Sequence, residues 1–93
     1  MNRTTSVTKS SSGTSDPVFA DAESALIITS DSWGAATIEI SGDGVNYVTL
    51  ENTSGTIALT GNKGIFVYGG LFYRLNISAY TSPVTMSLTR LEK

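Results

Sequence analysis

Residues 36–50 read ATIEISGDGVNYVTL, and this stretch decides the fold. Before its glycine-rich centre, apolar and polar residues alternate strictly, which places Ala36, Ile38 and Ile40 on one face of a strand. An Asp-Gly pair between two such segments is a strong hairpin signal, because the turn needs positive φ angles that glycine adopts without strain. We therefore predict an antiparallel hairpin made of residues 36–41 and 45–50.

On both sides of this stretch, from residue 25 to residue 89, short apolar or alternating segments follow one another, with turns of Gly, Asp, Asn and Ser between them. No segment has the 3.6-residue period of an amphipathic helix. The expected strands are residues 25–30, 36–41, 45–50, 56–60, 65–68, 71–79 and 84–89. About seven short, evenly spaced strands predict an all-β chain, folded as a small antiparallel β-sandwich or a small barrel.

The first sixteen residues, MNRTTSVTKSSSGTSD, have a different composition, with many Ser and Thr and one branched apolar residue, Val7. Asp16-Pro17 marks the boundary, because proline fixes its own φ and keeps the preceding residue extended. We expect a flexible N-terminal arm, residues 1–16, and a β-sandwich domain, residues 17–93. Ser and Thr suit an extended backbone, so the arm is expected to add a strand to a partner. Its candidate contact residues are Thr4, Thr5, Ser6, Val7 and Thr8.

The composition argues against catalysis. The chain has 93 residues, enough for one small domain, and contains neither Cys nor His. Disulfides, thiolate and imidazole metal ligands, and Ser-His or Cys-His nucleophile pairs are therefore excluded. The acids are scattered, and Asp31, Asp43 and Glu51 match no calcium-loop spacing. We expect a non-enzymatic protein without metal or cofactor, which gains stability from oligomerisation or from docking on a larger body.

Charge and hydropathy restrict the classes of partner that the protein is expected to bind. The formal net charge is -2, and the sequence has no clustered basic stripe of the kind that binds nucleic acid. The longest aliphatic run, residues 25–28, is far too short to cross a membrane. The N-terminus also lacks the apolar core of a secretory signal. We expect the protein to stay in the cytoplasm or to be assembled there into a particle, with neither a nucleic acid nor a membrane as its partner.

Three further residues are candidates for partner binding. Phe72 falls on the outward side of the predicted strand 71–79, where a loop covers it or a partner does. Arg74 lies on the same side, and either packs its stem while its head reaches water or pairs with a partner's charge. Trp33 sits in a turn, as a possible lid over one end of the sandwich. Aromatic residues of this kind either fill a small β core or form a platform for sugars.

Two segments carry a resemblance to a known family. Residues 38–50, IEISGDGVNYVTL, and residues 69–75, GGLFYRL, precede a last strand rich in Ser and Thr. They resemble small β-sandwich proteins of tailed-bacteriophage virions, in which an S-x-D-G-x-x-Y/W hairpin is followed by a Gly-aromatic-Arg strand. The resemblance covers residues 36–91. It implies a capsid cement or decoration protein on the virion surface that binds the major capsid protein at capsomer junctions as a homo-oligomer, with a trimer favoured.

The leading hypothesis predicts that removing residues 1–15 abolishes binding to particles and leaves the fold intact. The alternative is a carbohydrate- or receptor-binding module of a phage fibre or tail, whose glycan affinity depends on Trp33 or Tyr80. A head-tail connector or tail-tube subunit is a third possibility. Those proteins usually have longer loops or helices that line a ring, and this sequence predicts neither.

Overall fold

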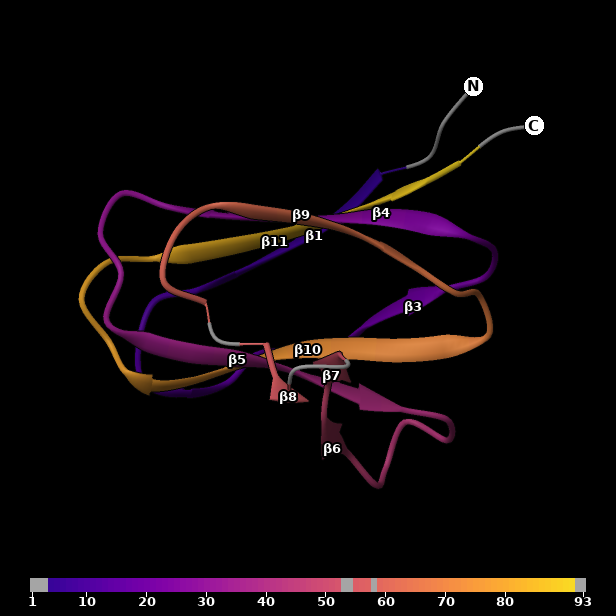
Figure 1. The fold of residues 1–93 in the computed structure, drawn as a ribbon, viewed down its shortest axis with the longest axis horizontal. Coiled ribbons are helices and arrows are strands. Elements are labelled where there is room, and N and C mark those ends of the chain that lie inside the picture. The colour runs from indigo at the N-terminus through magenta and orange to yellow at the C-terminus, as the bar shows by residue number, and fades with distance from the viewer. Residues whose placement is uncertain (1–3, 53–54, 58, 92–93) are drawn as a thin grey trace.

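The computed structural model describes residues 4–52, 55–57 and 59–91, and this part of the chain is all-β, with two antiparallel sheets facing each other as a sandwich (Figure 1). The strand order in sheet A is β1 (Thr4–Lys9), β11 (Val84–Arg90), β4 (Ser24–Ser30) and β9 (Lys63–Val67). The order in sheet B is β2 (Gly13–Thr14), β10 (Leu71–Ala79), β5 (Ala35–Ser41) and β6 (Val48–Thr49), and β3 (Val18–Ala20) also pairs with β10. A separate small hairpin joins β7 (Glu51–Asn52) to β8 (Gly55–Thr56). None of the described residues belongs to a helix that could span a membrane.

The core lies between the two sheets and is built by the alternation that the sequence shows. In β10 every second residue, Tyr73, Leu75 and Ile77, is buried, while the residues between them are half-exposed or exposed. In β11, Val84, Met86 and Leu88 are buried in the same way. Because each fully buried aliphatic side chain contributes about 1.5–3 kcal/mol, these rows stabilise the sandwich most.

The predicted β-sandwich is confirmed, with differences in strand number and length. In the part of the chain that the structure describes, nine strands form the two sheets, instead of about seven. The predicted hairpin exists, since Glu39 pairs with Thr49 in β5 and β6, but β6 has only two residues because residues 42–47 form a turn. The strand predicted for residues 56–60 is wrong in the part described: β8 ends at Thr56, and buried Leu59 instead donates its N–H to the Ala36 carbonyl at 2.9 Å. Residue 58 lies outside the described residues.

The N-terminal segment also differs from the prediction, because residues 4–16 belong to the sandwich instead of forming a separate arm. All six residues of β1 pair with β11, and the Val7 side chain packs against the core. β2 pairs with β10, and Thr14 lies opposite Asn76. Thr and Val favour the pleated conformation, and the edge of β11 within the same chain offers them an unpaired strand. We therefore expect this segment to contribute to folding, in contrast to the expectation from the sequence that it is dispensable.

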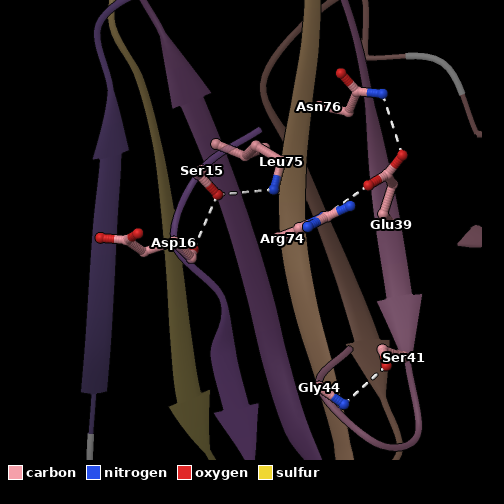
Figure 2. A network of polar contacts seen from close by, with 8 residues as sticks. All are labelled: Ser15, Asp16, Glu39, Ser41, Gly44, Arg74, Leu75 and Asn76. Carbon is pink, nitrogen blue, oxygen red and sulfur yellow. Dashed lines mark hydrogen bonds and ion pairs between the residues drawn. The ribbon is translucent and has the colours of Figure 1, made fainter. Parts of the chain in front are cut away.

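Ser15 explains why Asp16-Pro17 is not a domain boundary. Its backbone N–H donates to the Leu75 carbonyl at 2.9 Å, and its hydroxyl accepts the Leu75 N–H at 2.9 Å (Figure 2). The same hydroxyl donates to the Asp16 carbonyl at 3.0 Å. Because the serine hydroxyl accepts the Leu75 N–H, this backbone donor of β10 stays satisfied between the short strands β2 and β3. The Asp16-Pro17 pair thus marks a change of strand along the same sheet edge.

Candidate interaction surfaces

The outer face of sheet A is lined by small hydroxyl side chains. Three hydroxyl pairs bridge β1 and β11: Thr4 with Thr89 at 3.0 Å, Ser6 with Ser87 at 3.1 Å, and Thr8 with Thr85 at 2.9 Å. The register of the sheet places further residues of β4 and β9 on the same face, because directly paired residues point to the same side. Among the paired strand positions that the structure describes, the outer face consists of Thr4, Ser6, Thr8, Thr85, Ser87, Thr89, Ala25, Ile27, Thr29, Gly64 and Phe66.

None of these eleven positions carries a charge. Solvent-facing surfaces of soluble domains usually mix acidic and basic residues, so a whole sheet face without charge is unusual. Removing neutral hydroxyls from water costs much less than removing charges. Two large apolar side chains add to this face: Ile27 is 41% exposed and Phe66 is 82% exposed. The face therefore has the chemistry of a protein-docking surface.

The five N-terminal candidates are divided between the two sides of sheet A. Thr4, Ser6 and Thr8 lie on the outer face, while Thr5 lies opposite buried Leu88 and Val7 lies opposite buried Met86. Thr5 is exposed but lies on the other side of the sheet from Thr4, Ser6 and Thr8, and Val7 is half-buried, so the five residues do not face a partner together. The other three candidates, Trp33, Phe72 and Arg74, lie elsewhere on the sandwich, so the structure does not bring the predicted residues together into one site.

Arg74 lies on the outer face of sheet B and has its partners within the chain. Its Nε donates to Glu39 Oε1 at 2.7 Å, and Asn76 Nδ2 donates to the other carboxylate oxygen at 3.1 Å (Figure 2). The guanidinium also stacks over the Tyr47 ring, 3.8 Å from its centroid. The exposed fractions of the Arg74 and Glu39 side chains are 27% and 14%, so the ion pair is partly shielded from water. These contacts make Arg74 a structural residue of sheet B.

Phe72 is half-buried on the same face, and a loop covers it. Its ring centroid lies 4.8 Å from that of Phe19 on β3, with the two rings tilted by 48°. Gly44 lies so close that a Cβ atom at this position would be 3.3 Å from the Phe72 ring. Of the two explanations that the sequence left open for this outward aromatic residue, the structure supports the loop.

The turn that covers Phe72 is held by Ser41 and Asp43. The buried Ser41 hydroxyl accepts the Gly44 N–H at 2.9 Å (Figure 2). The same hydroxyl donates to the Asp43 carboxylate at 2.9 Å. The Asp43 carboxylate also accepts the backbone N–H groups of Asn46 and Val45, and these hydrogen bonds hold the pKa of Asp43 well below its usual range. Gly44 has a φ of 78°, which favours glycine. The motif residues from Ser41 to Tyr47 thus form one turn that closes over sheet B.

Trp33 lies in the turn between β4 and β5 and packs half-buried against the core. Its indole N–H donates to Asn62 Oδ1 at 3.3 Å, and Asn62 Oδ1 also accepts the Ser30 N–H. The neighbouring Gly34 is required by close packing, since a Cβ there would lie 2.0 Å from the Ala79 carbonyl oxygen. This geometry ties Trp33 to one end of the sandwich and leaves little of its ring for a ligand.

The edge of sheet A at β9 was not predicted as a site from the sequence, although Tyr68 is one of the aromatic residues that could form a sugar platform. Phe66 and Tyr68, which are 82% and 76% exposed, flank an apolar hollow of about 310 Å³ between β9 and the chain beside sheet B. Its lining consists of Ile40, Leu50, Glu51, Ile57, Ile65, Phe66, Val67, Tyr68, Leu71 and Tyr73. The signal in the sequence was the uninterrupted apolar run IFVY at residues 65–68, which a strand buried on both faces would also explain.

Within the described residues, no three acidic groups come close enough together to hold a metal ion. No protein-family model, no curated protein and no solved structure matches this chain. The surfaces of the sandwich are therefore the features from which a function can be inferred.

Proposed function

We propose that this protein is a non-enzymatic decoration protein that binds the outer surface of a bacteriophage capsid and stabilises the junctions between capsomers. The observation that carries the proposal is the outer face of sheet A, where eleven positions on four strands include no charged residue. Such a face suits a broad protein partner, because uncharged small groups can be covered at low desolvation cost and Phe66 and Ile27 gain from burial.

Sequence features support the same proposal. The absence of Cys and His leaves few residues for nucleophilic or acid-base chemistry, and the resemblance of residues 36–91 is to capsid cement proteins. The structure changes the proposed mode of attachment, since β1 already pairs with β11. We therefore place the contact with the major capsid protein on the outer face of sheet A, including Thr4, Ser6 and Thr8, instead of on a free arm.

Co-sedimentation with capsids that lack the protein tests this function. Ser87 lies at the centre of the outer face, between Ser6 and Ile27, so Ser87→Arg places a charge where the partner would desolvate it. We expect binding to fall by at least about tenfold, the change that corresponds to about 1.4 kcal/mol. Thr14→Arg is the matched control, because Thr14 is exposed on β2 in the opposite sheet. Equal binding of both variants and the unmodified protein would refute the proposed surface.

A second candidate function has one observation in its favour. Phe66 and Tyr68 are both largely exposed beside the same hollow, and exposed aromatic rings are a common feature of carbohydrate-binding proteins. A glycan- or receptor-binding module would use these two rings, instead of Trp33, which is half-buried. A glycan array compares the unmodified protein with Tyr68→Ala. Glycan binding that is lost in this variant would support the second function, and an array without binding would refute it.

A further inference from the structure

We infer that two copies of this chain associate through their β9 strands, so that their two A sheets form one continuous antiparallel sheet. Among the described residues, β9 pairs with β4 on one side and with no strand on its other side. A free edge carries unpaired backbone N–H and C=O groups and is a template for another strand. The proposal goes beyond capsid binding, because it names a partner for the backbone edge of β9. It shares Phe66, Ile27 and Gly64 with the border of the docking face, while Thr4, Ser6, Thr8 and the β11 hydroxyls stay clear of the dimer contact.

The residues of β9 are self-complementary. A two-fold axis at Ile65 sets this residue opposite its own copy, and sets Phe66 of each chain opposite Gly64 of the other. This register keeps paired residues on the same face, as an antiparallel ladder requires. Phe66 is 82% exposed in the single chain, and a glycine opposite gives its ring space to lie across the strand. An aromatic residue that covers a glycine on a neighbouring strand is a known means of stabilising a sheet.

The neighbours of Gly64 extend this contact. The Ile27 side chain leans over Gly64, so that a Cβ added to Gly64 would lie 3.1 Å from Ile27 Cδ1. Phe66 of the second copy would therefore meet Ile27, which is itself 41% exposed. The symmetry repeats this contact, so two Phe66 rings and two Ile27 side chains lose water contact together. Mutual burial of the exposed apolar side chains is the main gain expected from association.

The opposite side of β9 is also suited to a copy of itself. Ile65 lines the apolar hollow and is half-buried, and the Ile65 side chain of the second chain would lie beside it at the mouth of the hollow. The register sets Lys63 opposite Val67, so no like charges face each other across the new pair. A register centred on Lys63 would instead place two ammonium groups together, which is unfavourable.

Sedimentation of the whole chain tests the association. We expect a dimer of twice 9.8 kDa to form as the protein concentration is raised to about 100 µM. Phe66→Lys should raise the dissociation constant at least about tenfold, since it removes the central aromatic contact twice per dimer. Val45→Lys is the control, because Val45 is 79% exposed but lies on the 42–47 turn over sheet B, and this variant should remain a dimer. A monomeric or trimeric wild-type chain, or an unchanged dimer of Phe66→Lys, would overturn the inference.

The register is tested separately by cross-linking, since the chain has no cysteine of its own. Ile65→Cys chains should form a disulfide with one another, because this register sets Ile65 opposite its own copy and opposed residues on antiparallel strands lie close to disulfide distance. Preferential cross-linking of Gly64→Cys chains with one another, or no cross-linking at all, would overturn the register. Because Ser87 lies two strands away from the β9 edge, Ser87→Arg should remain dimeric even if capsid binding fails.

Discussion

The two outer faces of the sandwich differ in the chemistry of their side chains and in the contacts that these side chains make. The face of sheet B carries an Arg-Glu-Asn network under a tyrosine ring, and a hydrogen-bonded turn covers Phe72, while Phe19 beside it is 49% exposed. The face of sheet A carries hydroxyl pairs between neighbouring strands and two apolar side chains without cover. Charged and aromatic groups that point outward are therefore not by themselves a sign of a binding site. In this molecule such groups on sheet B make contacts within the chain, and the uncharged outer face of sheet A remains available to a partner.

Of the changes that test this difference between the two faces, removal of β1 should lower the free energy of unfolding most. Deletion of residues 1–9 exposes the edge of β11 and the core residue Met86 beneath Val7, so we expect a loss of at least about 3 kcal/mol in the free energy of unfolding. Urea unfolding followed by circular dichroism measures it. An unchanged midpoint would show that the segment is a dispensable arm, as the sequence alone suggested.

Arg74→Ala should produce the next largest effect. It removes the ion pair to a carboxylate that is only 14% exposed and the stacking on Tyr47, so we expect a destabilisation of about 2 kcal/mol. Arg90→Ala is the matched control, since the Arg90–Asp21 pair is longer, 3.6 Å, and both side chains are more than 40% exposed. That variant should change stability by less than about 0.5 kcal/mol. Similar losses in both variants would contradict the structural role assigned to Arg74.

The turn over sheet B should make stability depend on pH. Hydrogen bonds from Asn46 and Val45 lower the pKa of Asp43 in the folded state, so the folded protein binds fewer protons here than the unfolded chain. The stabilisation is therefore present above the ordinary carboxyl pKa of about 4 and is lost as the pH falls below it. Urea midpoints at neutral and acidic pH should differ more for the unmodified protein than for Asp43→Asn. An equal difference in both proteins would contradict the role of this carboxylate.

Tyr47→Phe should produce the smallest effect and a change of opposite sign. The Tyr47 hydroxyl is buried and has no hydrogen-bond partner among the described residues. Removing an unsatisfied buried hydroxyl while keeping the ring should raise the free energy of unfolding by about 0.5 kcal/mol. Thermal unfolding measures the change. A clear loss of stability would mean that the hydroxyl contributes to the cover of Arg74.

The sequence predicted the fold well where one local rule decided the structure. Alternation in residues 71–79 and 84–89 correctly identified the buried rows of β10 and β11, because one side of each strand faces the core. It failed for residues 4–16, where low hydrophobicity indicated disorder, although pairing with β11 supplies the missing stabilisation from a segment more than seventy residues away. Such long-range pairing leaves no local signal.

The candidate site was harder to predict for a related reason. Phe72 and Arg74 were identified correctly as outward residues, but their covers, Gly44 and Tyr47, come from a turn whose position depends on side-chain hydrogen bonds of Ser41 and Asp43. The uncharged face of sheet A appears only when the strands β1, β11, β4 and β9 are set side by side. The sequence contained each residue of that face, but the strand order that brings them together cannot be read from local patterns.

If the outer face of sheet A binds the capsid and the outer face of sheet B stabilises the fold, as we propose, two variants should separate binding from stability. Capsid co-sedimentation and urea unfolding are measured for Ser87→Arg on sheet A and for Arg74→Ala on sheet B. We predict that Ser87→Arg loses capsid binding at least about tenfold with its free energy of unfolding within about 1 kcal/mol of the unmodified protein. We predict that Arg74→Ala loses about 2 kcal/mol of stability and still binds. Binding lost in Arg74→Ala at a temperature where it is folded, with Ser87→Arg unaffected, would contradict the account.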